Sequence, residues 1–193
     1  MAKVLSVSPD ERGKKYHIDV DIDGKSTSYT VSAEAYAEIG LPTAGDELDE
    51  YSFGVVCFEH ESFLAIKKAY SLLASRDRSR REIRDKLTEC GFSFDASLRA
   101  VERLAELGYI DEADQIARAV LREANVSLRG PRLIVERLRI KGYDSSDIRR
   151  TIKELTECGE IDFKANFERL AEKKKACTDE KRYALKYRYG YGF

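Results

Sequence analysis

Alternating apolar and polar positions mark the start of the chain as β structure. Over residues 16–22 the two classes alternate strictly, which is the period of a half-buried strand. Asp23-Gly24 follows, a pair typical of a two-residue hairpin turn, whose central residues both need positive φ. Tyr29 and Val31 continue a returning strand, and Lys3–Val7 is a candidate third strand.

The pattern changes from period 2 to a helical period between residues 32 and 75. Ser32 is placed to cap a short helix that ends before Gly40 and Pro42. Residues 51–58 are apolar without a clear period, so they fit a strand or a helix equally well. After Glu61 a helix is predicted, with its buried face formed by Phe63, Ile66, Tyr70 and Leu73 at spacings of 3, 4 and 3.

Helix start and stop signals follow closely from residue 79 onward. Ser79 and Glu82 form a capping box, in which each side chain is expected to bind the other residue's amide. Gly91 is expected to end that helix in the left-handed conformation. Asp95 starts the next predicted helix, which ends at Gly108, and Asp111 begins a further one. In the helix predicted between Asp95 and Gly108, the third of the repeat, the residues expected to face inward are Leu98, Val101, Leu104 and Ala105.

The same signals recur 51 residues later. Residues 78–111 align without a gap to residues 129–162. The identical pairs are Arg78/Arg129, Arg81/Arg132, Ile83/Ile134, Leu87/Leu138, Gly91/Gly142, Arg99/Arg150, Leu104/Leu155, Glu106/Glu157, Gly108/Gly159, Ile110/Ile161 and Asp111/Asp162. They fall on helix stops and core positions, as expected of a duplicated unit. A third copy begins at Asp162, and its second helix is predicted over Thr178–Tyr189.

These patterns predict a mainly α protein of tandem three-helix, helix-turn-helix-like repeats in an elongated array, preceded by a small β-rich module. The expected parts are residues 1–60 for the β-rich module, then 62–110, 111–161 and a truncated 162–193 for the three repeats. Each repeat of about 50 residues is too small to be stable alone, so neighbours are expected to share apolar surface.

Composition predicts a soluble cytoplasmic protein whose charge is divided unequally. Residues 1–62 carry a net charge of −8 and residues 63–193 a net charge of +7, within a total of −1. No apolar run is long enough to span a membrane, and the first residues do not form a signal peptide. The four cysteines contain no C-x-x-C pair, which favours buried or half-buried reduced thiols over disulfides or a zinc site.

The residues that an enzyme would need are missing from the sequence. His17 and His60 have no nucleophile nearby in a known motif, and no phosphate-binding glycine loop occurs, so we expect neither catalysis nor a cofactor. Residues 19–24 resemble the first half of a calcium loop, but its twelfth position is Thr30 rather than a bidentate glutamate. We therefore expect no metal site.

Two basic clusters are the predicted binding residues, because they occupy the same place in successive repeats. They comprise Arg76, Arg78, Arg80, Arg81, Arg84 and Lys86 in the first repeat, and Arg129, Arg132, Arg137, Arg139 and Lys141 in the second. Such surfaces suit a polyanion or an acidic protein groove. The third helix of each repeat mixes acidic and basic residues, which argues against insertion into a DNA groove and for protein contact.

The order and spacing of these motifs resemble the RecX family of RecA recombinase regulators. The residues that carry the resemblance lie over Leu73–Phe92, in the joint Gly108–Asp111, and over Gly130–Tyr143. The resemblance implies a protein that lies along the groove of the RecA filament on single-stranded DNA and inhibits its ATPase and strand exchange, with weak binding to DNA alone. We expect the protein to be a monomer. The alternative is a helical-repeat DNA-binding protein that acts without RecA and depends strongly on salt.

Overall fold

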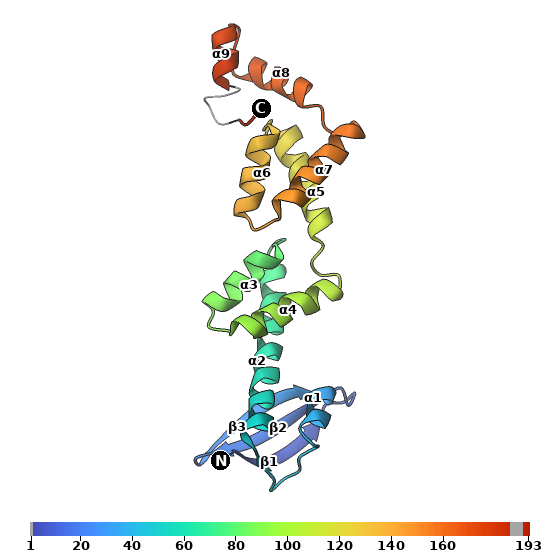
Figure 1. The fold of residues 1–193 in the computed structure, drawn as a ribbon, viewed down its shortest axis with the longest axis vertical. Helices are drawn as coiled ribbons and strands as arrows, with labels where there is room; N and C mark the ends of the chain where they lie inside the picture. The colour runs from blue at the N-terminus through green and yellow to red at the C-terminus, as the bar shows by residue number, and fades with distance from the viewer. Residues whose placement is uncertain (1, 186–190) are drawn as a thin grey trace. The chain divides into compact units, whose positions relative to one another are not determined.

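The computed structural model describes residues 2–185 and 191–193, which divide into two compact units (Figure 1). The first unit combines Met1–Ser75 with Ile83–Glu106, and the second combines Arg76–Glu82 with Leu107–Phe193. The predicted mainly α fold with a small N-terminal sheet is confirmed. The predicted division into four parts stays a prediction.

The N-terminal sheet has four antiparallel strands in the order β3-β2-β1-β4. They are β1 (Ala2–Pro9), β2 (Lys15–Ile22), β3 (Lys25–Ser32) and β4 (Glu47–Leu48). The turn between β2 and β3 has φ of 51° at Asp23 and 80° at Gly24, as the hairpin motif predicts. The predicted strands are therefore confirmed.

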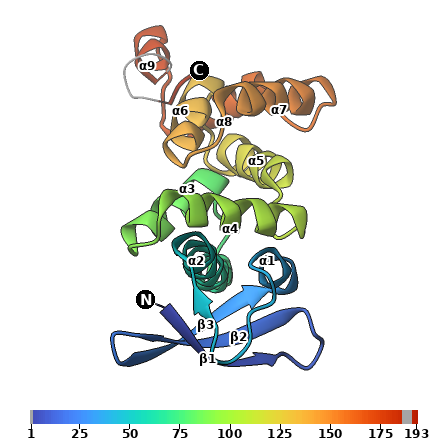
Figure 2. The same cartoon turned by 60° about the horizontal axis from the view of Figure 1, so that its bottom comes forward.

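Helices α1 (Ala33–Glu38) and α2 (Glu50–Leu73) lie on one face of the sheet (Figure 2). The Ser32 hydroxyl accepts a hydrogen bond from the amide of Ala35 and so caps α1, as predicted. Asp49 caps α2 by accepting from the amide of Ser52 at 2.7 Å. Residues 51–58, which fitted either structure, are therefore helical, and His60 lies within the same helix.

The buried face of α2 differs from the predicted one. Its buried residues are Val56, Glu59, Ser62, Ala65 and Ala69. The predicted residues Phe63, Ile66, Tyr70 and Leu73 are only half-buried. The physical reason is that α2 packs against both the sheet and α4 (Phe94–Glu106), and small side chains let the two helices approach closely.

Two polar side chains of α2 connect it to the end of β3. The Glu59 carboxylate accepts hydrogen bonds from the Ser32 amide and hydroxyl and forms an ion pair with Arg99 of α4. The neighbouring His60 accepts a hydrogen bond at Nδ1 from the Thr30 amide, at 3.0 Å. Burial lowers the pKa of His60, which keeps the ring neutral and able to accept this bond.

The helices after α2 repeat with the predicted period of 51 residues. Helices α3 (Arg80–Glu89), α4 and α5 (Glu112–Leu121) begin 51 residues before α6 (Pro131–Ile140), α7 (Ser145–Glu157) and α8 (Phe163–Lys173). Between α5 and α6 lies a π-helical turn, η1 (Arg122–Val126), and α9 (Asp179–Tyr183) follows α8. The duplication read from the sequence is thus present in the helix boundaries.

The matched glycines and aspartates have the same backbone role in both copies. Gly91 and Gly142 have φ of 94° and 93°, and Gly108 and Gly159 have φ of 75° and 82°. These are the left-handed helix ends that the sequence predicts. Asp111 and Asp162 cap α5 and α8 with nearly identical φ and ψ.

Two local predictions about these helices need correction. Ser93, and not Asp95, is the residue whose side chain caps α4. Leu98 is 38% exposed, because α4 turns its Ala96, Ala100 and Leu104 side inward. The predicted helix Thr178–Tyr189 begins as expected, with Thr178 as the cap of α9, and its residues 186–189 lie outside the described part of the chain.

Ser79 joins the first repeat to the second within the second unit. Its hydroxyl accepts from the Glu82 amide at 3.1 Å and donates to the Lys141 carbonyl at 2.7 Å, while Gly142 lies directly against it. The capping box is only half confirmed, because the Glu82 carboxylate binds the guanidinium groups of Arg76 and Arg78. The buried Ser79 hydroxyl therefore serves two helices at once.

The last residues of the chain make a similar joint with α6. The Gly130 and Arg132 amides donate to the carbonyls of Tyr191 and Gly192 at 2.6 and 3.1 Å. Gly130 is 51 residues after Ser79, and Tyr191 is 50 residues after Lys141, so the same pair of positions meets in both joints. Phe193 packs edge-on against Phe167 of α8, with ring centroids 5.2 Å apart.

The cysteines are free thiols, but three of them are more exposed than predicted. Cys57 is half-buried, whereas Cys90, Cys158 and Cys177 are exposed. Cys90 and Cys158 follow the last helical residues of α3 and α7, where the helix ends face solvent.

Candidate partner-binding surface

The first predicted basic cluster is largely matched by carboxylates of the protein itself. Arg76 and Arg78 share Glu82, and Arg80 forms an ion pair with Glu112 of α5, with N and O atoms 3.7 Å apart. Arg84 pairs with Asp85, and Lys86 pairs with Glu89 at 2.6 Å. Arg81 also takes part in a polar or electrostatic contact. This cluster therefore has little uncompensated charge to offer a partner.

The second cluster divides into a paired and an unpaired half. Arg129 and Arg137 both contact the buried carboxylate of Glu123 in η1. Across residues 2–185 and 191–193, Arg132, Arg139 and the Lys141 ammonium form no ion pair, and all three residues are exposed. Of the eleven predicted residues, eight therefore have a polar or charged partner within the protein, and three face solvent without an ion pair in the described residues.

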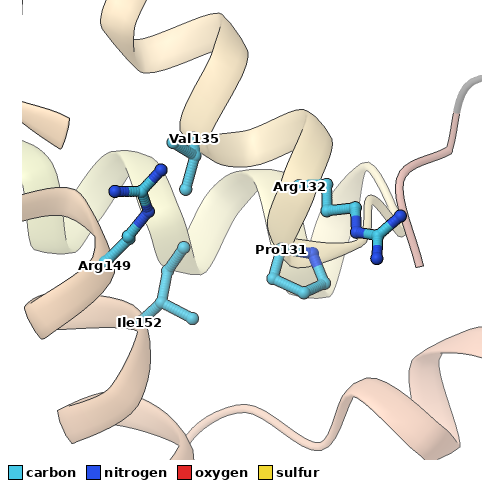
Figure 3. Close-up of a pocket in the computed structure, with 5 residues that line it drawn as sticks. All are labelled: Pro131, Arg132, Val135, Arg149 and Ile152. Atoms are coloured by element: carbon cyan, nitrogen blue, oxygen red, sulfur yellow. The ribbon is translucent and has the colours of Figure 1, made fainter.

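Arg132 lies at one end of a shallow hollow of about 320 Å³ between α6 and α7. Figure 3 shows its lining as a row, with Arg149 at one end, Val135, Ile152 and Pro131 in the middle, and Arg132 at the other end. Pro131 stands at the first position of α6, where its missing N–H costs nothing. Aliphatic side chains therefore form the floor, and a guanidinium group stands on either side.

Arg149 is a candidate that the sequence interpretation missed. The matched position in the first repeat is Leu98, so the comparison of repeats does not single it out. A signal was present nonetheless, since no acidic residue lies three or four positions from Arg149 on its helix. Its neighbour Arg150, by contrast, pairs with Asp147 at 2.6 Å and contacts Glu154 at 3.9 Å.

The titratable groups near the first joint are structural in character. Tyr143 is buried and donates a hydrogen bond to Gln115 at 3.0 Å. Burial raises the pKa of Tyr143 to about 12, with further contributions from the carboxylates of Glu112, Asp77 and Glu82. Hydrogen bonds from Ser146 and Asp147 lower the pKa of Asp144, the α7 cap, and Arg149 adds a smaller effect of the same sign.

The described residues contain neither a metal-binding cluster nor a helix that could span a membrane. No group of three His, Cys, Asp or Glu side chains is placed there to hold a metal ion. None of the helices in those residues is long and apolar enough to cross a bilayer.

The fold defines a class of protein in which a small N-terminal sheet precedes consecutive three-helix units along the sequence. Comparison with protein families narrows this class, because residues 65–104 match the model of the first three-helix domain of RecX. Over these residues the chain is similar to the RecX family.

Two curated relatives illustrate the likeness. A regulatory protein RecX from Lactobacillus delbrueckii subsp. bulgaricus is 29% identical over 157 residues, which cover 81% of this chain and 56% of the relative. A regulatory protein RecX from Mycolicibacterium smegmatis is 34% identical over 90 residues, covering 46% of this chain and 47% of the relative. The chain thus spans about half the length of these relatives.

Two solved structures share the fold. A crystal structure of regulatory protein RecX has a TM-score of 0.65 and 22% identity, covering 95% of this chain and 89% of that chain. A crystal structure of RecX from Lactobacillus salivarius has a TM-score of 0.53 and 21% identity, covering 63% of this chain and 80% of the other. At these identities the likeness concerns the fold alone.

Proposed function

We propose that this protein regulates the RecA recombinase by binding the RecA filament on single-stranded DNA along its groove. In this proposal it acts as a cytoplasmic monomer that lowers ATP hydrolysis and strand exchange, and it is not an enzyme. The observation that carries the proposal is the similarity to the first three-helix domain of RecX and to relatives that are named regulatory protein RecX. The 51-residue period adds physical support, because equal units in a row suit a partner that is itself periodic.

The binding residues in this proposal are ranked by their free charge. Arg132, Arg139 and Lys141 rank first, since no carboxylate of the described residues pairs with them. Residues that share their charge with an internal carboxylate rank lower, because exchanging an internal ion pair for an external one brings little net gain. Those residues are Arg76, Arg78, Arg80, Arg84, Lys86, Arg129 and Arg137, and Arg81 belongs with them as a contacted side chain.

The test is the ATPase rate of RecA on single-stranded DNA, titrated with this protein. The proposal expects a concentration-dependent fall in the rate. The variant Arg132→Glu/Arg139→Glu should shift the half-inhibitory concentration upward by at least about tenfold, because each reversal replaces attraction by repulsion. The variant Lys67→Glu/Lys68→Glu is the control: it makes the same charge change at exposed residues of α2. An unchanged ATPase rate with the wild-type protein would refute the proposal.

A second candidate is a DNA-binding protein that acts without RecA. The net charge of +7 over residues 63–193 favours it, because basic surfaces bind phosphate backbones without sequence preference. This candidate expects tight binding to naked single-stranded DNA that weakens steeply with salt, and no effect of RecA on that affinity.

A further inference from the structure

The hollow between α6 and α7 (the groove) combines an aliphatic floor with two arginines that form no ion pair within the described residues. Its floor consists of the aliphatic side chains of Pro131, Val135 and Ile152, and its two ends carry Arg132 and Arg149 (Figure 3). At about 320 Å³ it lies at the small end of the range for binding sites, with room for one or two side chains and not for a large ligand.

The two arginines are available for an external partner. Within the described residues neither guanidinium group takes part in an ion pair, although α7 carries three acidic residues and α6 carries one. Arg150 shows the contrast, since it stands next to Arg149 on α7 and is held by two carboxylates of its own helix. A guanidinium group is a planar donor that matches a carboxylate or a phosphate with two parallel hydrogen bonds.

The aliphatic floor favours a carboxylate-bearing protein segment over a phosphate as the bound anion. Proteins that hold single-stranded nucleic acid combine basic groups with aromatic side chains on which bases stack. Among the residues that the structure describes, none of those lining the hollow is aromatic, and the aliphatic floor gains nothing from a phosphate group. Aliphatic surface is stabilised by covering it with another apolar side chain.

We propose that this groove binds an acidic protein segment, which places one bulky apolar side chain on Pro131, Val135 and Ile152. Carboxylates on either side of that side chain bind Arg132 and Arg149. The site goes beyond the proposed function, because it does not depend on which protein carries the segment.

The groove belongs to the second repeat only. The matched positions of the first repeat are Arg80, Arg81, Arg84, Leu98 and Val101, where basic residues replace Pro131 and Val135. Arg80 and Arg84 are moreover paired with Glu112 and Asp85. The first repeat therefore lacks both the aliphatic floor and the free guanidinium groups in this pattern.

The experiment is a titration of the ¹⁵N-labelled full chain, followed by NMR chemical shifts. The first probe is a synthetic peptide of Asp and Glu residues with one central Phe. The second probe replaces that Phe by Ser, and the third is a single-stranded oligothymidylate of matched charge. The proposal expects the Phe peptide to shift amide signals of α6 and α7, and to bind at least about fivefold more tightly than the other two probes, because only it covers the floor.

Variants of the chain localise the effect. Arg132→Glu/Arg149→Glu should weaken binding of the Phe peptide by at least about tenfold, since both charge-assisted contacts become repulsive. Lys67→Glu/Lys68→Glu makes the same charge change on α2 and should leave the affinity within about twofold of the wild type.

Three results would overturn the proposal. One is the absence of shifts in α6 and α7 at millimolar peptide. Another is equal binding of the Ser peptide, which would mean that only charge matters. The third is equal or tighter binding of the oligothymidylate, which would make the groove a phosphate site. Retention of the native NMR spectrum by both charge-reversal variants is the check that each still folds.

Discussion

Substituting Gly142 by Ala tests whether the joint between the first two repeats is as tight as the structure has it. Gly142 ends α6 with φ of 93°, a left-handed conformation in which an alanine is strained by about 1–2 kcal/mol. The added Cβ would also lie 2.6 Å from the Ser79 hydroxyl oxygen and 3.0 Å from the Cβ of Arg81. Gly142→Ala therefore carries two penalties.

The second penalty is what distinguishes this glycine from its counterpart in the same unit. Gly159 ends α7 with φ of 82°, and a Cβ there would meet nothing within 4 Å. Gly159→Ala should therefore cost the strain alone, about 1–2 kcal/mol. Gly142→Ala should cost about 1–3 kcal/mol more, the usual penalty for forcing an extra carbon into a packed contact.

The assay is urea unfolding followed by circular dichroism, which gives the free energy of unfolding of each variant. Ser79→Ala alone should destabilise the protein by about 1–2 kcal/mol, because it removes the α3 cap and the hydrogen bond to the Lys141 carbonyl. In that background Gly142→Ala should cost about 1 kcal/mol less than in the wild type, since the Ser79 oxygen that it meets is gone.

Equal losses for Gly142→Ala and Gly159→Ala would refute this reasoning. So would strict additivity of Ser79→Ala and Gly142→Ala. Either result would mean that the turn after α6 does not press against the start of α3.

Three further predictions concern other contacts. The free energy of unfolding should fall as the pH drops below about 6.5 toward the lowered pKa of His60, because the unfolded chain takes up a proton that the buried ring does not. In urea titrations at several pH values, His60→Asn should make the free energy of unfolding depend less on pH, and an unchanged dependence would contradict this. Glu59→Gln should lower the free energy of unfolding by about 1–3 kcal/mol, because Glu59 is 9% exposed and forms an ion pair with Arg99. Glu61→Gln should lower it by less than about 1 kcal/mol, because Glu61 binds Ser93 at the exposed surface, and the reverse order in unfolding experiments would contradict the structure. Deleting Phe193 should speed hydrogen exchange in α8 by several-fold, since its ring packs on that helix, and unchanged exchange would show that the contact is unimportant.

The repeat could be predicted from sequence because its signals are local. A glycine that must be left-handed and an aspartate that caps a helix act within one turn of chain, so their spacing alone places the helices. Gly91, Gly108, Gly142 and Gly159 all have the expected conformation. The hairpin at Asp23-Gly24 was equally predictable for the same reason.

The buried face of α2 and the pairing of the arginines could not be predicted, because they depend on distant partners. A search for large apolar residues selects Phe63 and Ile66, whereas contact with two neighbours buries Ala65 and Ala69 instead. The charge of Arg80 is compensated by an ion pair with Glu112, which lies 32 positions away in the sequence. Arg149 becomes a candidate binding residue only in the structure, where it lines the groove and forms no ion pair within the described residues.

We propose that this protein recognises RecA assembled on single-stranded DNA. The most direct measurement is its affinity for an immobilised oligonucleotide, first bare and then coated with RecA in the presence of a slowly hydrolysed ATP analogue. We expect this protein to bind the RecA-coated oligonucleotide at least about tenfold more tightly than the bare one at physiological salt, where contacts to phosphates alone are weak. Equal affinity for both surfaces, or tighter binding to the bare oligonucleotide, would contradict it.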